Sequence, residues 1–198
     1  INVRSLEEAR KRAVGEGYKN IDFIKADVNN LSFDNESFDV VIVGNVFSLM
    51  SDKGKALNEC MRVCKKDGFI IAIPMYYLKS PSEELIKEVS NAIKVNITPL
   101  YKPDWINFFS IPDLEIYWSK DFKFDYIKDS FIKSFVKKIM SRPHLRNMDK
   151  EVFGKLRDKY ERYMFLFRDN LSHMGYTILI LSKRKIWVDP ELYTSREI

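Results

Sequence analysis

Two short runs of apolar, mostly β-branched residues constrain the fold of this chain more than any other feature. They cover residues 39–44 and 69–73, and neither alternates apolar with polar side chains. Such runs are typical of strands that are buried on both faces of a sheet. Helix-like stretches with short connections separate them. The first half of the chain therefore predicts an α/β fold with a doubly wound, mostly parallel sheet, a Rossmann-like arrangement with helices on both faces.

Start and stop signals define the neighbouring elements. Ser5, followed three residues later by Glu8, forms a capping box, so we expect the first helix to begin at Ser5. Gly15 and Gly17 are expected to end it. Further along, the pattern predicts a strand over residues 21–27, a helix over residues 51–66 and a helix that starts near Ser80.

The second half of the chain differs in character. Residues 97–118 are rich in aromatic side chains, and a basic helical stretch follows over residues 124–171, with a break at Pro143. One more strand is expected at residues 176–181. Because there is no internal repeat and no flexible linker, we expect a single domain over residues 1–198, in which residues 96–172 form a helical cap inserted before the last strand.

Composition excludes several classes of protein. The chain has 198 residues, of which 45% are hydrophobic and only 7 are glycine, so collagen-like and disordered chains are excluded. No apolar stretch reaches the roughly 18 residues of a membrane span, and we expect no membrane partner. Cys60 and Cys64 are too few for a disulfide framework, which favours a cytoplasmic protein. They also lack further ligands for a metal site, so core packing is expected for both.

Positive charge is concentrated in the second half. Residues 119–185 hold 17 Lys and Arg against 8 Asp and Glu, a net charge of +9, although the whole chain has only +5. Such a surface can be a solvated helical face, or it can attract an anionic substrate or nucleic acid. The basic residues are spread around the helices, which favours the solvated face.

Two polar residues follow strands of the predicted sheet. Asp27 ends the strand over residues 21–27, and Asn45 follows the strand over residues 39–44. Ligands of open parallel sheets bind beyond the carboxyl ends of the strands. The Asp27 carboxylate with the amide of Val28 would suit the edge of an adenine ring, although Asp27 can equally cap a loop. Asn45 can meet a polar ligand or cap the next helix.

Three segments in the first half resemble the class I S-adenosylmethionine-dependent methyltransferases, in particular those that act on small molecules. Residues 25–43 contain the Asp, the loop with Leu and Phe, and the Ser-Phe-Asp that precedes a buried strand in that family. Residues 45–52 are similar to the segment after that strand. Residues 57–69 are similar to the element that leads into the next strand. The three segments stand in the family's order and spacing.

The resemblance implies S-adenosylmethionine as cofactor and a role for four residues. Asp27 would bind the adenine amine and Val28 its ring nitrogen, while Asn45 and Val46 would lie beside the methionine part and the departing methyl group. Glu59 and Arg62 would be structural, as would Phe38 and Asp39.

The chain also departs from the family pattern. The glycine-rich loop that holds the methionine end has no counterpart, and the acidic residue that binds the ribose is absent, with Asn2 the nearest candidate. Asn2 can hydrogen-bond a hydroxyl, but less strongly than a carboxylate. We therefore expect that an N-terminal strand–loop–helix unit is missing from the sequence, or that another segment replaces it.

The expected activity is methyl transfer from S-adenosylmethionine to a small-molecule acceptor. This reaction needs in-line alignment and exclusion of water, and a general base only when the acceptor must lose a proton. His144, in the cap, is the candidate for such a base; Tyr76 and Tyr77 are expected to pack beneath the cap. Two alternatives remain: an RNA methyltransferase that uses the basic cap, and a non-catalytic binding or assembly subunit.

Overall fold

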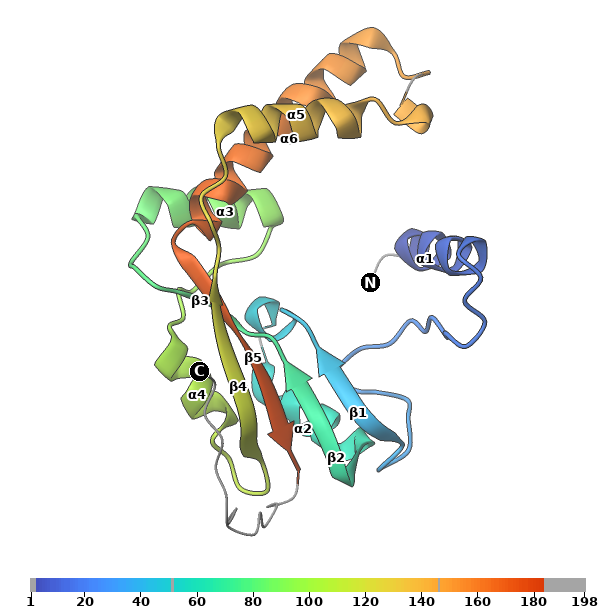
Figure 1. Cartoon of the computed structure of the whole chain (residues 1–198), viewed down its shortest axis with the longest axis vertical. Helices are drawn as coiled ribbons and strands as arrows, with labels where there is room; N and C mark the ends of the chain where they lie inside the picture. The colour runs from blue at the N-terminus through green and yellow to red at the C-terminus, as the bar shows by residue number, and fades with distance from the viewer. Residues whose placement is uncertain (1–2, 51, 146, 184–198) are drawn as a thin grey trace, which may run out of the picture.

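The computed structural model describes residues 3–50, 52–145 and 147–183 and shows a mixed sheet with helices (Figure 1). Strand β1 (Phe38–Val43) pairs with β2 (Cys64–Ala72) in parallel. Strand β5 (Met174–Ser182) runs antiparallel to β2, to β3 (Met75–Tyr77) and to β4 (Glu115–Lys123). The strand order is β1-β2-β5-β3, with β4 also paired to β5.

The α/β class is confirmed, but the prediction of a mostly parallel sheet is wrong for the described residues. A parallel pair needs a crossover, and α2 (Lys53–Val63) supplies it between β1 and β2. Strands β4 and β5 are instead consecutive strands that pair like the two sides of a hairpin. The helices between them lead the chain away from the end of β4 and back to the start of β5. Neighbours in a hairpin are antiparallel.

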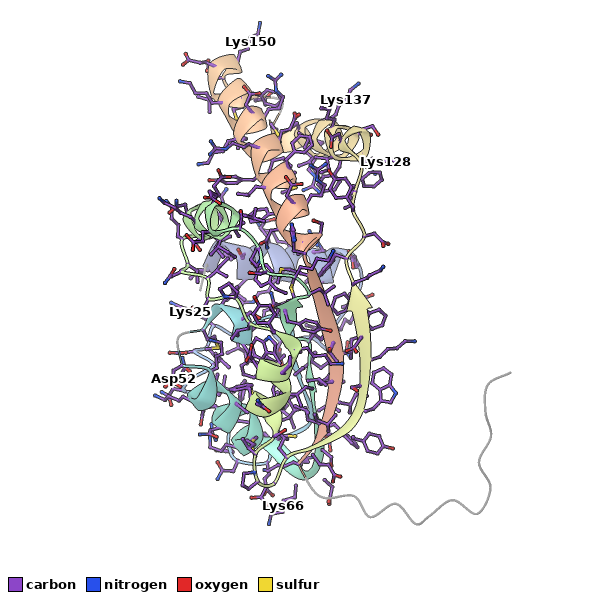
Figure 2. The ribbon with its side chains drawn as sticks, turned by 90° about the vertical axis from the view of Figure 1, so that its left-hand side faces the viewer. Lys25, Asp52, Lys66, Lys128, Lys137 and Lys150 are labelled. Atoms are coloured by element: carbon purple, nitrogen blue, oxygen red, sulfur yellow. The ribbon has the colours of Figure 1, made fainter. Side chains whose placement is uncertain are left out.

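The main core lies on one face of this sheet. Helices α2 and α4 (Lys102–Phe109) both cover that face, as Figure 2 shows from the side. Cys60 and Cys64 are buried there as free thiols, which confirms their expected packing role. The core contains these further buried side chains: Phe47, Ala56, Leu57, Ile70, Ala72, Trp105, Phe109, Leu179 and Leu181.

The opposite face of β1 is open in the described part of the chain. Val40 is 45% exposed and Ile42 is 69% exposed, so the prediction that this strand is buried on both faces is wrong here. The reason is that α2 and α4 cover the same face, while α1 (Val3–Gly15) stands apart from the sheet (Figure 1).

Several predicted boundaries need correction. The first helix begins at Val3, which places Ser5 inside α1, although it ends at Gly15 as expected. Residues 21–27 form no strand, because no described strand pairs with them. A strand is stable only when its backbone groups find partners, and these residues run alone as an extended loop. The third helix, α3 (Glu83–Ile93), starts after Ser82, whose side chain accepts from the Leu85 N–H.

The expected cap is more than a set of helices, because it also supplies strand β4. Beyond β4 an arm extends away from the sheet, made of α5 (Asp129–Met140), the short helix η2 (Pro143–Leu145) and α6 (Lys150–Leu171) (Figure 1). The predicted break near Pro143 is confirmed. The arm has its own small core of Ile132, Val136 and Met140 against α6. None of the helices in the described ranges combines the length and apolar character needed to cross a membrane.

Candidate functional site

The carboxyl end of β1 presents two buried polar atoms without a partner. Asn45 follows the strand, and Ser48 lies in the short helix η1 (Phe47–Leu49). Within the described residues, Asn45 Oδ1 and Ser48 Oγ are buried and make no hydrogen bond. Native proteins satisfy the great majority of their buried polar atoms, so such atoms call for a ligand or an ordered water. Val46, between them in sequence, is 44% exposed.

A cavity of about 160 Å³ adjoins these residues. Asn45 and Ser48 line it together with mainly apolar side chains from β3, α3 and the last turns of α6, among them Met75, Ile93 and Phe167. A cavity of about 150 Å³ accommodates a benzene molecule, so this one has room for a single six-membered ring. A larger hollow of about 870 Å³, near Lys66, lies at the opposite end of the sheet, where the rule for parallel strands places no ligand.

Tyr77 and Asn170 form a polar pair in the cavity wall. The Tyr77 hydroxyl donates to Asn170 Oδ1 at 2.8 Å, and both residues are buried. The Asn170 amide in turn donates to Met174 Sδ at 3.4 Å. Burial raises the pKa of Tyr77, so its phenol stays protonated and acts as a donor at neutral pH. Burial of both tyrosines is as expected, but sequence analysis missed Asn170, because only the fold shows that this helical residue faces β3.

Asp27 acts as a loop cap in the structure. Its Oδ1 accepts from the backbone N–H of Asn29 at 3.0 Å and from the Asn29 side chain at 3.3 Å, while the carboxylate as a whole stays exposed. Val28 packs against the main core and anchors the loop. The structure therefore shows the loop-capping role of Asp27, and its contact with adenine stays a prediction.

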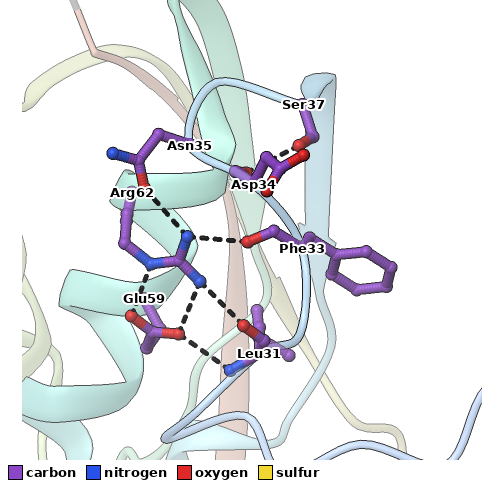
Figure 3. Close-up of polar contacts among 7 residues, drawn as sticks. All are labelled: Leu31, Phe33, Asp34, Asn35, Ser37, Glu59 and Arg62. Carbon is purple, nitrogen blue, oxygen red and sulfur yellow. Dashed lines mark hydrogen bonds and ion pairs between the residues drawn. The ribbon is translucent and has the colours of Figure 1, made fainter.

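Arg62 fixes the loop that follows Asp27, as Figure 3 shows. From α2, its guanidinium donates to the backbone oxygens of Leu31 and Phe33 at 2.8 and 2.7 Å and to Asn35 Oδ1 at 2.9 Å. The same guanidinium forms an ion pair with Glu59, whose carboxylate also accepts from the Leu31 N–H at 2.8 Å. The structural role expected for Glu59 and Arg62 is consistent with these contacts.

The charge of Glu59 depends on this arrangement. Hydrogen bonds from Arg62 are the largest cause, followed by the one from the Leu31 N–H, and together they lower the pKa of Glu59 from 4.5 to about 2. A carboxyl whose pKa is lower in the folded state stabilises the fold above its ordinary pKa. That contribution is lost as the pH falls from 4.5 through about 2.

We expect Glu59→Gln to lower the melting temperature at pH 7 by several degrees, because glutamine cannot form the ion pair with Arg62. The gap between variant and parent should close as the pH falls toward 2, where Glu59 of the parent becomes protonated. Thermal unfolding followed by circular dichroism from pH 7 to pH 2 measures both effects. Glu8→Gln, on the exposed face of α1, is the control. A gap that is independent of pH would contradict this role of Glu59.

The other predicted site residues lie elsewhere. The backbone of His144 is in η2, at the tip of the arm and away from the carboxyl end of β1 (Figure 1). The structure does not bring it beside Asn45, and its role as a base stays a prediction. Asn2 lies outside the described residues. Within residues 3–50, 52–145 and 147–183, no group of three His, Cys, Asp or Glu is placed to hold a metal ion.

The first part of this chain is similar to known proteins. Residues 1–72 match the model of a methyltransferase domain. This match agrees with the resemblance of the first part of the chain to the class I S-adenosylmethionine-dependent methyltransferases. A relative in Coxiella burnetii, the ubiquinone/menaquinone biosynthesis C-methyltransferase UbiE, is 30% identical over 100 residues, which are 50% of this chain and 39% of that protein. The 2-methoxy-6-polyprenyl-1,4-benzoquinol methylase of Leishmania donovani is 41% identical over 68 residues, 34% of this chain and 24% of that protein.

Solved structures of the methyltransferase fold match nearly the whole chain. The MccD protein superposes with a TM-score of 0.73 at 22% identity, over 93% of this chain and 77% of its own. The [4+2]-cyclase SpnF has a TM-score of 0.66 at 16% identity, over 93% of this chain and 64% of its own. A geranyl diphosphate methyltransferase solved with S-adenosylmethionine has a TM-score of 0.55 at 10% identity, over 92% and 66%.

The sequence matches and the structural matches support different conclusions. The structural matches show the fold alone, and a fold hosts more than one chemistry, as the cyclase illustrates. The chain spans less than half the length of the curated methyltransferases it matches. The similarity of residues 1–72 to a methyltransferase domain is thus shown, while the activity of this chain has to be argued from its site.

Proposed function

We propose that this protein transfers a methyl group from S-adenosylmethionine to a small, largely apolar acceptor. The observation that carries the proposal is the pair of unpartnered atoms, Asn45 Oδ1 and Ser48 Oγ, beside a ring-sized apolar cavity at the carboxyl end of β1. Ligands of α/β sheets bind at this edge. The names of the relatives, ubiquinone/menaquinone biosynthesis C-methyltransferase and benzoquinol methylase, describe acceptors of matching chemistry.

Asn45, which lies at this edge, suits the cofactor, and the other contacts follow from the sequence prediction. Asp27 and Val28 would hold the adenine, Asn45 and Val46 would lie along the methionine part, and Asn2 would reach the ribose. An amide with an unpartnered oxygen suits the methionine ammonium, a strong donor. Bound there, S-adenosylmethionine supplies an electrophilic methyl group on a sulfonium.

The cavity would contribute by positioning the acceptor and by excluding water. Its apolar walls exclude water and hold an acceptor ring, and the Tyr77 oxygen, whose proton is donated to Asn170, can accept a hydrogen bond from a substituent of the ring. Alignment of this kind supplies much of the rate enhancement in a transfer that needs little from charged side chains. His144 stays a candidate base only for an acceptor that must lose a proton.

We also propose that a further strand–loop–helix unit, upstream of the described residues, completes the cofactor site. Strand β1 leaves one edge without a partner among the described strands, and its outer face exposes Val40 and Ile42. Natural sheets cover or pair such edges. This unit would carry the glycine-rich loop, and residues 1–198 would then be one methyltransferase domain with the cap at residues 96–172.

Titration calorimetry with S-adenosylhomocysteine tests the proposal, on this chain and on a chain that carries an upstream strand–loop–helix unit. Micromolar binding by the longer chain alone supports both proposals, and binding by both chains supports the enzyme without the upstream unit. If neither chain binds, the enzyme is rejected in favour of a non-catalytic subunit.

Asp27→Ala is expected to weaken S-adenosylhomocysteine binding by roughly 10- to 100-fold, the value of a charged hydrogen bond. The matched control is Asp22→Ala, in the same extended loop and also exposed, which should bind as the parent does. Circular dichroism should show both variants folded. Equal affinity in the Asp27 variant and the parent would rule out the adenine contact.

A further inference from the structure

The outer side of α5 carries an unusual stripe of side chains. Phe131 is 64% exposed and Phe135 is 41% exposed, one helical turn apart. Lys128 precedes Phe131 by three residues, and Lys138 follows Phe135 by three, so the four lie along one side of the helix. The buried residues Ile132, Val136 and Met140 occupy the other side, against α6.

The stripe is positive at both ends and has no negative charge of its own. Lys128 and Lys138 are exposed, and the exposed Arg142 follows the end of the helix. The acidic residue of α5, Asp129, is paired with Arg168 of α6 and therefore does not neutralise the lysines. Figure 2 shows α5 beside α6 on the arm, beyond the end of β4, with Lys128 near the start of the helix.

We propose that this stripe docks the protein on an anionic phospholipid bilayer. A helix that lies in a membrane interface combines aromatic side chains, which enter the boundary between headgroups and acyl chains, with lysines and arginines that attract anionic headgroups. The 12-residue helix is about 18 Å long, so both rings and both lysines can meet a flat surface at once. The arm holds the helix clear of the sheet.

Nucleic acid fits this surface less well. Proteins that stack bases on aromatic rings place those rings in a positively charged groove that follows the backbone. Phe131 and Phe135 instead project from the convex side of one helix. The expectation from sequence of no membrane partner rested on the absence of a membrane span, and docking by a surface helix does not require one.

Docking at this place has a consequence for the cavity. Helix α6 runs from the tip of the arm to the cavity, where Phe167, Asn170 and Leu171 form part of its wall. A bilayer bound at α5 would thus lie at the outer part of the arm, and the other end of the arm, at the C-terminal turns of α6, lines the apolar cavity. The docking itself does not depend on the proposed methyl transfer, and it can be tested without the cofactor.

Sedimentation with lipid vesicles tests the proposal on the full chain. We expect binding to vesicles of phosphatidylcholine with phosphatidylglycerol, weak or no binding to phosphatidylcholine alone, and a decrease as salt is added. The double variant Lys128→Glu/Lys138→Glu should bind roughly tenfold more weakly or worse, since each lysine near an anionic surface contributes. Lys79→Glu/Lys87→Glu changes the net charge equally at exposed positions elsewhere and should bind as the parent does.

A second pair of variants separates insertion from charge attraction. Phe131→Ser/Phe135→Ser should also lose roughly tenfold or more, because the rings no longer enter the interface. Tyr117→Ser/Trp118→Ser, on exposed aromatic residues of β4, should bind as the parent does. Circular dichroism should show all variants folded.

Three results would overturn the proposal. The first is that no vesicles bind, or that binding survives both stripe variants. The second is that the Lys128 and Lys138 variant loses binding to single-stranded RNA while the parent ignores vesicles, which would assign the stripe to nucleic acid. The third is a parent that self-associates in solution, with the association removed by the Phe131 and Phe135 variant, which would assign the stripe to a second copy of the chain.

Discussion

Replacing Trp105 by alanine is expected to lower the free energy of unfolding by about 3–5 kcal/mol, the usual cost of removing a large aromatic side chain from a core. Trp105 is only 1% exposed and packs with Phe108 and Phe109. Its indole N–H also donates to the Met75 carbonyl at 2.9 Å. The variant would therefore lose packing and leave that carbonyl without its partner.

Chemical denaturation measures this effect, and Trp118→Ala is the matched control. Trp118 is the same residue type, but it is 42% exposed on β4, and its loss should cost about 1 kcal/mol or less. Trp105→Phe keeps most of the packing and should fall between the two. If both alanine variants were equally stable, α4 would not be the element that closes the core.

Gly68→Ala is the second change with a large expected effect, a loss of about 3 kcal/mol, at the upper end of what overpacking costs. A Cβ at Gly68 would lie 2.7 Å from the Asp39 carbonyl oxygen and 2.8 Å from Cys64 Sγ. One of these contacts is backbone and cannot move aside cheaply. The parallel pairing of β1 and β2 is irregular at this point, where the register shifts between Phe38 and Val40.

Gly154→Ala provides the opposite control. Gly154 lies inside α6, and an added Cβ there would meet nothing within 4 Å. Alanine is the better helix former by about 1 kcal/mol, so this variant should be more stable than the parent. Denaturation midpoints of the two variants should therefore move in opposite directions. A Gly68 variant as stable as the parent would mean that β2 does not approach β1 this closely.

Sequence patterns of a few residues correctly predicted the helices and strands that depend on neighbouring residues. The apolar runs at residues 39–44 and 69–73 became β1 and the second part of β2, and the break at Pro143 separates α5 from α6. The resemblance to methyltransferases was also recognisable from the segments around Asp27, Asn45 and Glu59, and residues 1–72 match a methyltransferase domain. The predicted strand over residues 21–27 failed because strand formation depends on a neighbour.

The sequence by itself determined the resemblance of residues 1–72 to methyltransferases, the positions of most helices and strands, and the residues that follow β1. Only the tertiary structure decided that the sheet is mixed, that Asn170 meets Tyr77 across 93 positions of sequence, and that Arg62 holds the loop after Asp27. The physical reason is the separation in sequence between the residues that interact. Helix caps, turns and apolar periodicity depend on residues a few positions apart, whereas strand partners, buried polar pairs and cavities form between segments that only the complete chain brings together.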